Sequence, residues 1–373
     1  MNKIMILLAI SALCLNVFGA GKVIENKAKP LKGEWDFNLQ KVWATDDAGE
    51  DVLVRVGMIR VDESGKIYVL EPMQSKFFVF AADGKFLYTF GKKGEGPGEF
   101  RMAFNFFLLG DQIIVPEMGK FHFFSTTGKY IKSINLGAMI FPMAFLDAGR
   151  FIYTGDGDRG KKRPDTLKIY DMQSKKSKVI AEIPREESLT ATSGRMVLRV
   201  KDSSSTPGIV LGARDNYLYF GKSDKYHIKK TGLDGKEIFS FTLEGRKRKK
   251  ISTAYKRKRF SNVIVNGRKM PKEMLDQMVK SMPDEATFFN RIKIDENGLI
   301  YVFISDLENE TGREVDIFSA RGKYLYHGEI EMPDNYVIKS RRLIFKSGYL
   351  YVFADDEEGE GKLLKFKIDM PKN

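Results

Sequence analysis

The chain has 373 residues, of which 43% are hydrophobic, 12% aromatic and 30% charged. This composition excludes a largely disordered polymer, a collagen-like chain and a protein with many membrane spans. The formal net charge is +13, from 62 Lys and Arg against 49 Asp and Glu, and only three histidines and one cysteine are present. The sequence therefore offers little for metal or thiol chemistry, and we expect no cofactor.

The N-terminus has the pattern of a secretory signal. Lys3 gives a positive start, residues 4–15 form an apolar run, and small residues follow up to Ala20. The run is too short to cross about 30 Å of hydrocarbon, and no later segment approaches ~18 uninterrupted apolar residues. We therefore expect a signal peptide over residues 1–21, a secreted or periplasmic location, and a mature chain over residues 22–373 without a transmembrane span.

Cys14 leaves lipoprotein anchoring open as an alternative. That anchoring needs the cysteine at the cleavage site, whereas Leu13 precedes it in place of a small residue and the apolar run surrounds it. Cleavage after the run removes Cys14, and the mature chain then forms no disulfide. Its stability would come from core burial alone.

A repeated strand pattern organises the rest of the chain. Residues 59–90 alternate apolar and polar positions between turns at Ser64-Gly65 and Asp83-Gly84, as hairpins do. The same layout recurs over residues 106–136, 145–183, 209–243, 292–330 and 343–368. Six such units predict an all-β protein, a six-bladed β-propeller of four-stranded antiparallel blades. A β-sandwich or two separate sheets are the alternatives.

The ends of the array predict how it closes. The last unit has three strands, and residues 35–44 form a spare strand near the mature N-terminus. A circular array must join its ends, so we expect this strand to be the outer strand of the sixth blade.

The first unit resembles an NHL-type repeat of six-bladed propellers. The matching features are Tyr68-Val69, Glu71, Lys76-Phe77, Phe80, Asp83-Gly84 and the tail over residues 91–100. The other five units keep the spacing but lack the Gly-Pro-Gly tail. As a whole the chain is similar to secreted bacterial six-bladed propellers. Many of these have no known activity, so the resemblance implies a six-bladed fold and does not imply an activity.

Two connections are longer than ordinary loops. Residues 185–207 hold one alternating piece, 196–200, which is compatible with a small hairpin. In the second connection, residues 246–289, Met274, Met278 and Met282 recur at four-residue spacing and predict one short helix over residues 271–282, between blades 4 and 5. That helix either packs on the propeller surface or forms a methionine-rich lid over the channel mouth.

The front of the second connection is strongly basic. Residues 246–285 hold thirteen basic and four acidic residues, a net charge of +9. Such a patch binds phosphates, anionic polysaccharide or anionic lipid head groups, or is a solvated segment. The candidate anion-binding residues are Arg246, Lys247, Arg248, Lys249, Lys250, Lys256, Arg257, Lys258 and Arg259.

Acidic residues gather in the turns between second and third strands, which open on one common face of a propeller. We interpret them as solvated turn residues and predict no metal site, although hard cations do take carboxylate oxygens. The residues are Glu71, Glu117, Asp156, Asp158, Asp224, Asp306, Glu308 and those at 355–358.

No catalytic motif is present in the sequence. It has no G-x-S-x-G elbow, no H-E-x-x-H and no C-x-x-C, and the glycine string over residues 91–98 lacks the Gly-Lys-Ser/Thr ending of a phosphate loop. A lactonase-like cation site would use the axial ends of first strands, where the few candidates are Asp62, Asn105, Asp147 and Asp295. The three histidines, His122, His227 and His327, fall on third or fourth strands and should not converge.

The sequence therefore predicts an exported, non-catalytic binding or interaction module without catalytic residues. We expect a monomer whose partner is a protein or a polyanionic envelope ligand, a polysaccharide or a lipid head group; because the protein is exported, nucleic acid is not an expected partner. A propeller hydrolase or lyase with an axial divalent cation is the alternative, and a structural part of an envelope assembly is a third.

Overall fold

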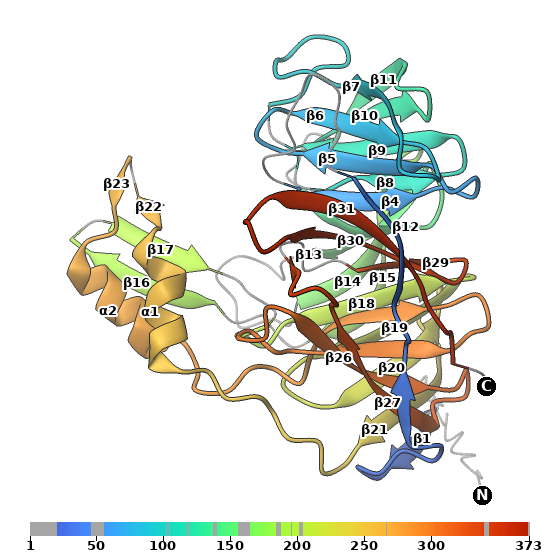
Figure 1. The fold of residues 1–373 in the computed structure, drawn as a ribbon, viewed down its shortest axis with the longest axis vertical. Helices are drawn as coiled ribbons and strands as arrows, with labels where there is room; N and C mark the ends of the chain where they lie inside the picture. Colours follow the sequence, from blue (N-terminus) through green and yellow to red (C-terminus); the bar gives the residue numbers. More distant parts are fainter. Residues whose placement is uncertain are drawn as a thin grey trace, which may run out of the picture.

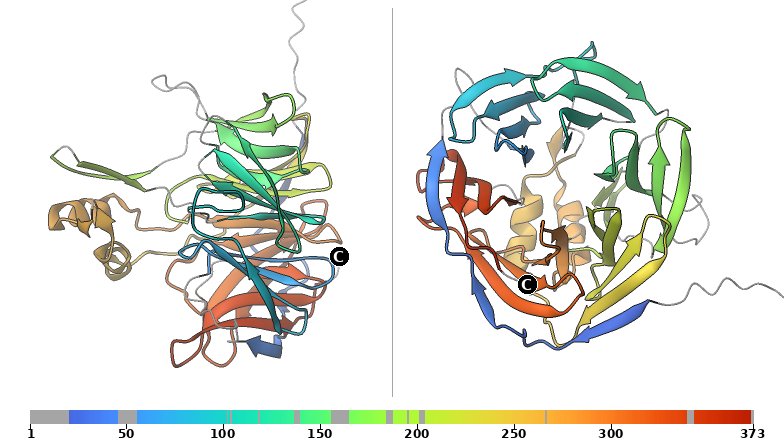
Figure 2. Two further views of the ribbon diagram at one scale, coloured as in Figure 1. Left: turned by 90° about the horizontal axis from the view of Figure 1, so that it is seen from above. Right: turned by 90° about the vertical axis from the view of Figure 1, so that its right-hand side faces the viewer.

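The computed structural model describes residues 21–45, 56–101, 103, 105–117, 119–136, 140–155, 165–183, 188–194, 196–200, 204–265, 267–338 and 343–371. Six sheets surround a central axis, seen along the axis in the right panel of Figure 2 and edge-on in Figure 1. The sequence-based prediction of a six-bladed β-propeller is confirmed. The predicted signal peptide lies outside the described residues except for Gly21.

Blades 1 to 3 are four-stranded and antiparallel, and each is built from one continuous stretch of chain. Blade 1 consists of β4 (Met58–Val61), β5 (Ile67–Glu71), β6 (Lys76–Phe80) and β7 (Phe86–Phe90). Blade 2 consists of β8 (Phe107–Leu109), β9 (Gln112–Glu117), β10 (Lys120–Ser125) and β11 (Tyr130–Asn135). Blade 3 consists of β12 (Pro142–Phe145), β13 (Arg150–Gly155), β14 (Asp165–Asp171) and β15 (Lys176–Ile183).

Blades 4 to 6 each gain a strand from the N-terminal segment. Blade 4 consists of β18 (Ile209–Arg214), β19 (Tyr217–Lys222), β20 (His227–Gly232), β21 (Glu237–Leu243) and β1 (Lys22–Asn26). Blade 5 consists of β24 (Phe289–Ile294), β25 (Ile300–Ile304), β26 (Gly312–Phe318), β27 (Tyr324–Glu331) and β2 (Glu34–Asp36). Blade 6 consists of β28 (Val337–Ile338), β29 (Ile344–Lys346), β30 (Tyr349–Asp355), β31 (Gly361–Lys367) and β3 (Gln40–Thr45).

The N-terminal segment runs round the rim of these three blades, blue in Figure 2. β1 and β2 pair in parallel with β21 and β27, and β3 pairs antiparallel with β31. Closure of blade 6 by an N-terminal strand is thus confirmed, but the expectation that residues 35–44 form one strand of that blade is wrong. Trp35 lies in β2 on blade 5, because Asn38 turns the chain with a φ of 45° and its N–H donates to Asp36 Oδ1 at 2.8 Å.

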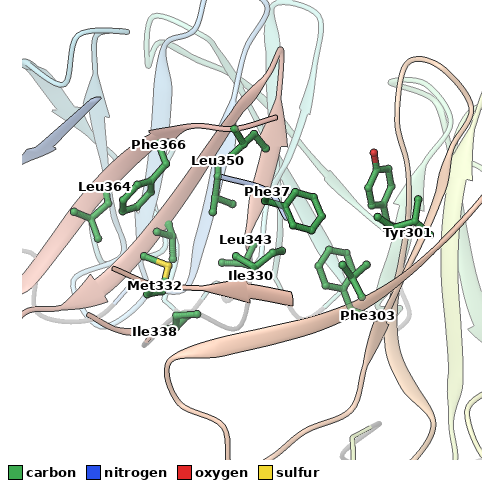
Figure 3. Packing of buried hydrophobic residues seen from close by; sticks show 14 of the residues in the cluster. Phe37, Tyr301, Phe303, Ile330, Met332, Ile338, Leu343, Leu350, Leu364 and Phe366 are labelled. Atoms are coloured by element: carbon green, nitrogen blue, oxygen red, sulfur yellow. The ribbon is translucent and has the colours of Figure 1, made fainter. Parts of the chain in front are cut away.

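The core consists of six apolar clusters, one between each pair of neighbouring blades. Figure 3 shows the cluster between blades 5 and 6, where Phe37 of the N-terminal segment packs among Tyr301, Phe303 and Leu350. Phe37 is fully buried, and its ring lies so close to Gly328 that a Cβ there would come within 2.9 Å. Burial of a side chain of this size contributes about 1.5–3 kcal/mol, so the segment adds to the core as well as to the sheet edges.

The two long connections form a separate unit, which we call the insertion unit. The first contributes a hairpin, β16 (Leu189–Ser193) and β17 (Met196–Val200), as the alternating pattern predicts. The second contributes α1 (Thr253–Ser261), the hairpin β22 (Ile264–Val265) and β23 (Arg268–Lys269), and α2 (Lys272–Ser281). The predicted helix over residues 271–282 is thus confirmed as α2, and a second helix that the sequence did not indicate, α1, precedes it in the same insertion. Among the described residues, neither helix has the length and apolar character that crossing a membrane requires.

Candidate functional site

The insertion unit stands on the face of the propeller where the turns between second and third strands also open. Both connections of the unit lead from the outer strand of one blade to the inner strand of the next, so they leave the disc on that face. The unit projects away from the blades in Figure 1, and along the axis its helices lie behind the central opening in Figure 2. The basic residues of the second connection and the acidic residues of the turns between second and third strands therefore lie on the same face of the propeller.

The methionine face of α2 packs mainly inside the insertion unit, and Leu307, in the turn between β25 and β26 of blade 5, belongs to the same apolar cluster. Met274 and Met278 are both 0% exposed and cluster with Leu189 and Ala191 of the β16–β17 hairpin. Phe260 of α1 completes this small core. Neither interpretation of the helix anticipated this arrangement, in which residues from two insertions bury one another.

α1 carries four of the nine candidate anion-binding residues, and most of the set is engaged in ion pairs. Lys256 is buried and its Nζ donates to Met282 O at 2.8 Å and to Asp284 Oδ1 at 2.6 Å. The other pairs are Arg246 and Lys249 with Glu314, Arg248 with Glu285, Arg257 with Asp276, and Lys258 with Glu310.

Lys247 and Lys250 differ from the rest of the set. Both are exposed, and within the described residues no acid lies within 4 Å of either ammonium group, although the charge of Lys250 helps to lower the pKa of nearby Asp284. Because Arg257 and Lys258 pair only at the surface, where an ion pair is worth about 0–1 kcal/mol, their charges also remain accessible to a competing anion.

A buried charged network anchors the second insertion to blade 5. Asp316 is fully buried and accepts hydrogen bonds from Tyr226 Oη at 2.9 Å and Tyr324 Oη at 2.8 Å, and its Oδ1 lies 3.0 Å from His327 Nδ1. Arg246 Nε lies 3.4 Å from its other oxygen. Burial opposes the charge of Arg246, but Asp316 and Glu314 outweigh it and raise the pKa of the guanidinium.

The acidic turns serve mainly to hold backbone and to receive the insertion. Glu308 accepts from Ser252, the N-cap residue of α1, and Asp306 Oδ1 accepts the N–H of Glu308. Glu117 accepts from Arg101 N, and its other oxygen lies 3.2 Å from His122 Nε2. Asp356, Glu358 and Glu360 come close enough to offer oxygens to one cation, although Asp356 already accepts two turn N–H groups. Asp156 and Asp158 lie outside the described residues.

An axial cavity of about 410 Å³ lies in the half of the channel remote from the insertion unit. Inner strands of all six blades line it, mostly with apolar side chains, and Met370 of the C-terminal segment borders it. Its charged residues among those described are Arg60, Lys293 and Asp295. The channel thus presents an apolar and basic lining, which suits binding of an apolar or anionic group more than coordination of a cation.

The polar residues at the ends of first strands have local roles. Asp62 and Asp295 each accept two N–H groups of the following turn and a tyrosine hydroxyl, from Tyr68 and Tyr301 respectively. Asp147 accepts from Gly149 N and from Arg150, and Asn105 lies 3.5 Å from Arg60 Nη2. Since these carboxylates tie down their own turns, they do not form an axial set.

The histidines lie on three different blades, as their positions in the repeats predict. His122 is on β10, the third strand of blade 2, His227 on β20, the third strand of blade 4, and His327 on β27, the fourth strand of blade 5. His122 lies within hydrogen-bond distance of Glu117 and Ser133, and His327 of Asp316. They do not converge on one site.

A polar cleft that the sequence did not reveal lies beneath α1. It measures about 200 Å³ and is bordered by Tyr255 of α1, Arg291 of β24 and Arg313 of β26, with Asn290 and Glu310 beside them. Its walls come from blade 5, blade 6 and the insertion unit, which are far apart in sequence. The cleft offers donors and acceptors on the same face as the accessible lysines.

Comparison with known proteins supports the fold. The family model DUF5128, described as a 6-bladed beta-propeller, matches residues 47–206, which span blades 1 to 3. No curated protein matches the chain. A solved structure from Bacteroides fragilis NCTC 9343, described as an exported protein, has a TM-score of 0.53 and 14% identity, covering 94% of this chain and 100% of that one.

A second solved structure, a member of the DUF4221 family from Bacteroides vulgatus, has a TM-score of 0.55 and 14% identity, covering 90% of this chain and 99% of that one. At these identities the likeness concerns the fold. Sheet topology and the family model agree that this chain is a six-bladed β-propeller, whose antiparallel blades carry an added N-terminal strand on blades 4 to 6.

Proposed function

We propose that this protein is an exported binding module that holds a polyanionic ligand on the face bearing the insertion unit. Export rests on the signal pattern over residues 1–21, and one structural neighbour is described as exported. As part of this proposal, we infer that blade 1 is an NHL-type repeat, because its sequence resembles that repeat. Envelope polysaccharides and lipid head groups are the polyanions that such a location offers.

The observation that carries the proposal is the surplus of basic charge on the insertion unit. Residues 246–285 have a net charge of +9, and the acids of blade 5 that pair with them, Glu308, Glu310, Glu314 and Asp316, reduce this excess without cancelling it. Lys247 and Lys250 are exposed, and among the described residues neither forms an ion pair within 4 Å, although Lys250 interacts with Asp284 over a longer distance. A locally positive, solvent-facing surface raises the local concentration of anions and speeds their association.

The axial channel supports binding more than catalysis. Asp295, the carboxylate in the described lining of the cavity, is committed to two N–H groups and the Tyr301 hydroxyl. Most glycoside hydrolases use two carboxylates placed on opposite sides of the scissile bond, and the described lining does not supply such a pair. The binding proposal therefore requires no reaction step.

The test is retention on immobilised heparin over a salt gradient. A triple variant, Lys247→Gln, Lys250→Gln and Lys258→Gln, should elute at clearly lower salt than the wild type. Each lysine that contacts heparin releases counterions from it, and the variant loses that gain. Salt also screens the attraction, since the Debye length is about 8 Å at 0.15 M. Exposed charge substitutions of this kind change the free energy of unfolding by less than about 0.5 kcal/mol each, so the fold should persist.

A matched control removes three positive charges from the opposite face. Lys85, Lys129 and Lys236 are exposed residues of turns between third and fourth strands, which open away from the insertion unit. Their triple Gln variant has the same net charge and should elute close to the wild type. Equal shifts in the two variants would mean that heparin responds to net charge, and the proposed face would then be rejected.

A further inference from the structure

A third cavity lies between blades 3 and 4, and its lining includes no residue of the insertion unit or of the axial cavity. It measures about 390 Å³, within the size range of small-molecule sites. One wall is the end of β15, and the other consists of β19, β20 and the turn between them. The turn at Gly235 closes one end, since with a φ of 88° it approaches β15 so closely that a Cβ would lie 2.4 Å from Ile180 O.

Unsatisfied polar atoms concentrate in this cavity. Seven buried side-chain nitrogen or oxygen atoms in the described residues have no hydrogen-bond partner, and three of them, Asp224 Oδ1, His227 Nε2 and Thr231 Oγ1, belong to residues that line it. Thr231 is only 3% exposed. Buried polar groups are almost always paired in folded proteins, so three such atoms in one cavity call for an external partner.

Strand register aims these residues at the cavity. Thr231 pairs with Leu218 and Lys229 with Phe220, and both apolar residues belong to the cluster between blades 3 and 4. Residues directly opposite in an antiparallel pair point to the same face of the sheet, and alternate residues along β20 share that face. His227, Lys229 and Thr231 therefore all face blade 3.

The charges of the lining balance. Lys222 Nζ lies 3.1 Å from Asp224 Oδ2, and Lys229 Nζ lies 2.9 Å from Glu237 Oε2. The remaining charged residues, Lys225 and Glu182, are exposed and of opposite sign. Burial, followed by the charge of Lys229, lowers the pKa of His227, which keeps the imidazole neutral at pH 7. A net anion or cation finds no excess of opposite charge here.

The chemistry of the lining indicates what binds. Asp224 Oδ1 requires a donor, while the Thr231 hydroxyl and the neutral imidazole of His227 can each take either role. A hydroxyl group both donates and accepts, and a compound with several hydroxyls satisfies such a mixed set. Phe220, Ile183 and Ile209 provide an apolar wall for carbon–hydrogen faces. We propose that the cavity between blades 3 and 4 binds a neutral polyhydroxylated ligand of one or two sugar rings.

The test is titration calorimetry together with saturation-transfer NMR, using glucose, galactose, N-acetylglucosamine and maltose as probes and glucuronate as the anionic counterpart. We expect saturable binding of at least one neutral sugar and weaker binding of glucuronate. Thr231→Val keeps the shape of the side chain and removes the hydroxyl, so it should weaken binding about fivefold or more. Asp224→Asn should weaken it as well.

Ser240→Ala is the matched control. Ser240 is 1% exposed on the same blade and its hydroxyl is also unpartnered, but it does not line the cavity. This variant should bind sugar like the wild type. Because the Thr231 hydroxyl has no protein partner, Thr231→Val should also leave the melting temperature unchanged or higher, which separates ligand binding from a structural role.

Several outcomes would overturn the inference. They are the absence of saturable binding for all four neutral sugars, tighter binding of glucuronate, and equal affinities for wild type and Thr231→Val. Loss of heparin retention in the lysine variant would not affect these results, because none of the three lysines lines this cavity.

Discussion

The side chain of Gln277 on α2 bonds to both backbone polar groups of Thr192 on β16. Its Oε1 accepts from Thr192 N at 2.9 Å, and its Nε2 donates to Thr192 O at 3.0 Å. The amide of Gln277 thus pairs with an edge strand as a further strand would. Thr192 and Gln277 are 85 residues apart in the sequence, and their contact joins the two insertions into one unit.

Gln277→Ala should loosen the hairpin from the helices and leave the propeller intact. Each lost hydrogen bond is worth about 0.5–1.5 kcal/mol, so opening of β16 and β17 should become roughly tenfold more frequent. Amide hydrogen exchange in residues 189–200 measures this opening directly. Unchanged exchange there would show that the apolar cluster around Met274 and Met278 holds the unit without this pair.

Removal of the N-terminal segment should destabilise the whole propeller. A chain that begins at residue 47 lacks β3, so β31 becomes an unpaired edge strand. It also lacks Phe37, whose removal leaves a gap in the apolar cluster between blades 5 and 6. We expect a loss of more than about 3 kcal/mol, together with aggregation on thermal unfolding.

The control for this truncation begins at residue 32 and lacks only β1. It exposes β21 as an outer strand, a state in which β7, β11 and β15 of blades 1 to 3 already exist. Its melting temperature should lie much nearer to the wild type. Equal melting temperatures for both truncations and the wild type would contradict closure through β3.

The propeller itself could be predicted from the sequence, because period-2 alternation and turn residues are local signals repeated in every unit. The rest depends on long-range contacts. α1 has a charged surface and few apolar residues, so the sequence shows no apolar periodicity that would predict this helix. Its N-terminus is fixed by Ser252, whose Oγ accepts a hydrogen bond from Tyr255 N. β2 is parallel to β27 and separate from β3, which follows from the turn at Asn38.

The candidate sites were the least predictable part for the same reason. The basic run was visible in the sequence, but Glu314, which neutralises Arg246 and Lys249, lies 65 or more residues away. The polar cleft beneath α1 and the cavity between blades 3 and 4 each combine separate elements. No local spacing of residues encodes such a juxtaposition.

His327 and His122 should give opposite contributions to stability as pH changes. The hydrogen bond to Asp316 raises the pKa of His327 above its ordinary 6.5, so its stabilising charge is fully present below pH 6.5 and is lost as pH rises through the higher value. Burial lowers the pKa of His122, so the folded state resists its protonation and stability is lost as pH falls below 6.5.

Urea unfolding of His327→Gln and His122→Gln between pH 5 and 8 separates these contributions. Relative to its variant, the wild type should lose stability on the alkaline side for His327 and on the acidic side for His122. Parallel pH profiles of wild type and either variant would contradict the environment described for that histidine.

Saturating Ca²⁺ should leave the melting temperature nearly unchanged. Asp356, Glu358 and Glu360 approach one another, but Asp356 is committed to two turn N–H groups and lies 3.5 Å from Lys362 Nζ. A ligand at 100 times its Kd adds about 2.7 kcal/mol, which a thermal scan with and without EDTA would detect. A rise of several degrees that Asp356→Asn abolishes would establish a cation site in this turn.

Hydrogen exchange of the chain over residues 22–373 with a bound heparin hexasaccharide tests the central proposal most directly. The binding proposal predicts slower exchange over residues 246–262, which include the accessible lysines and α1, with no change in the inner strands β4, β8 and β24. Protection confined to those inner strands would move the binding site to the axial channel. Absence of any protection at saturating hexasaccharide would contradict the proposed function.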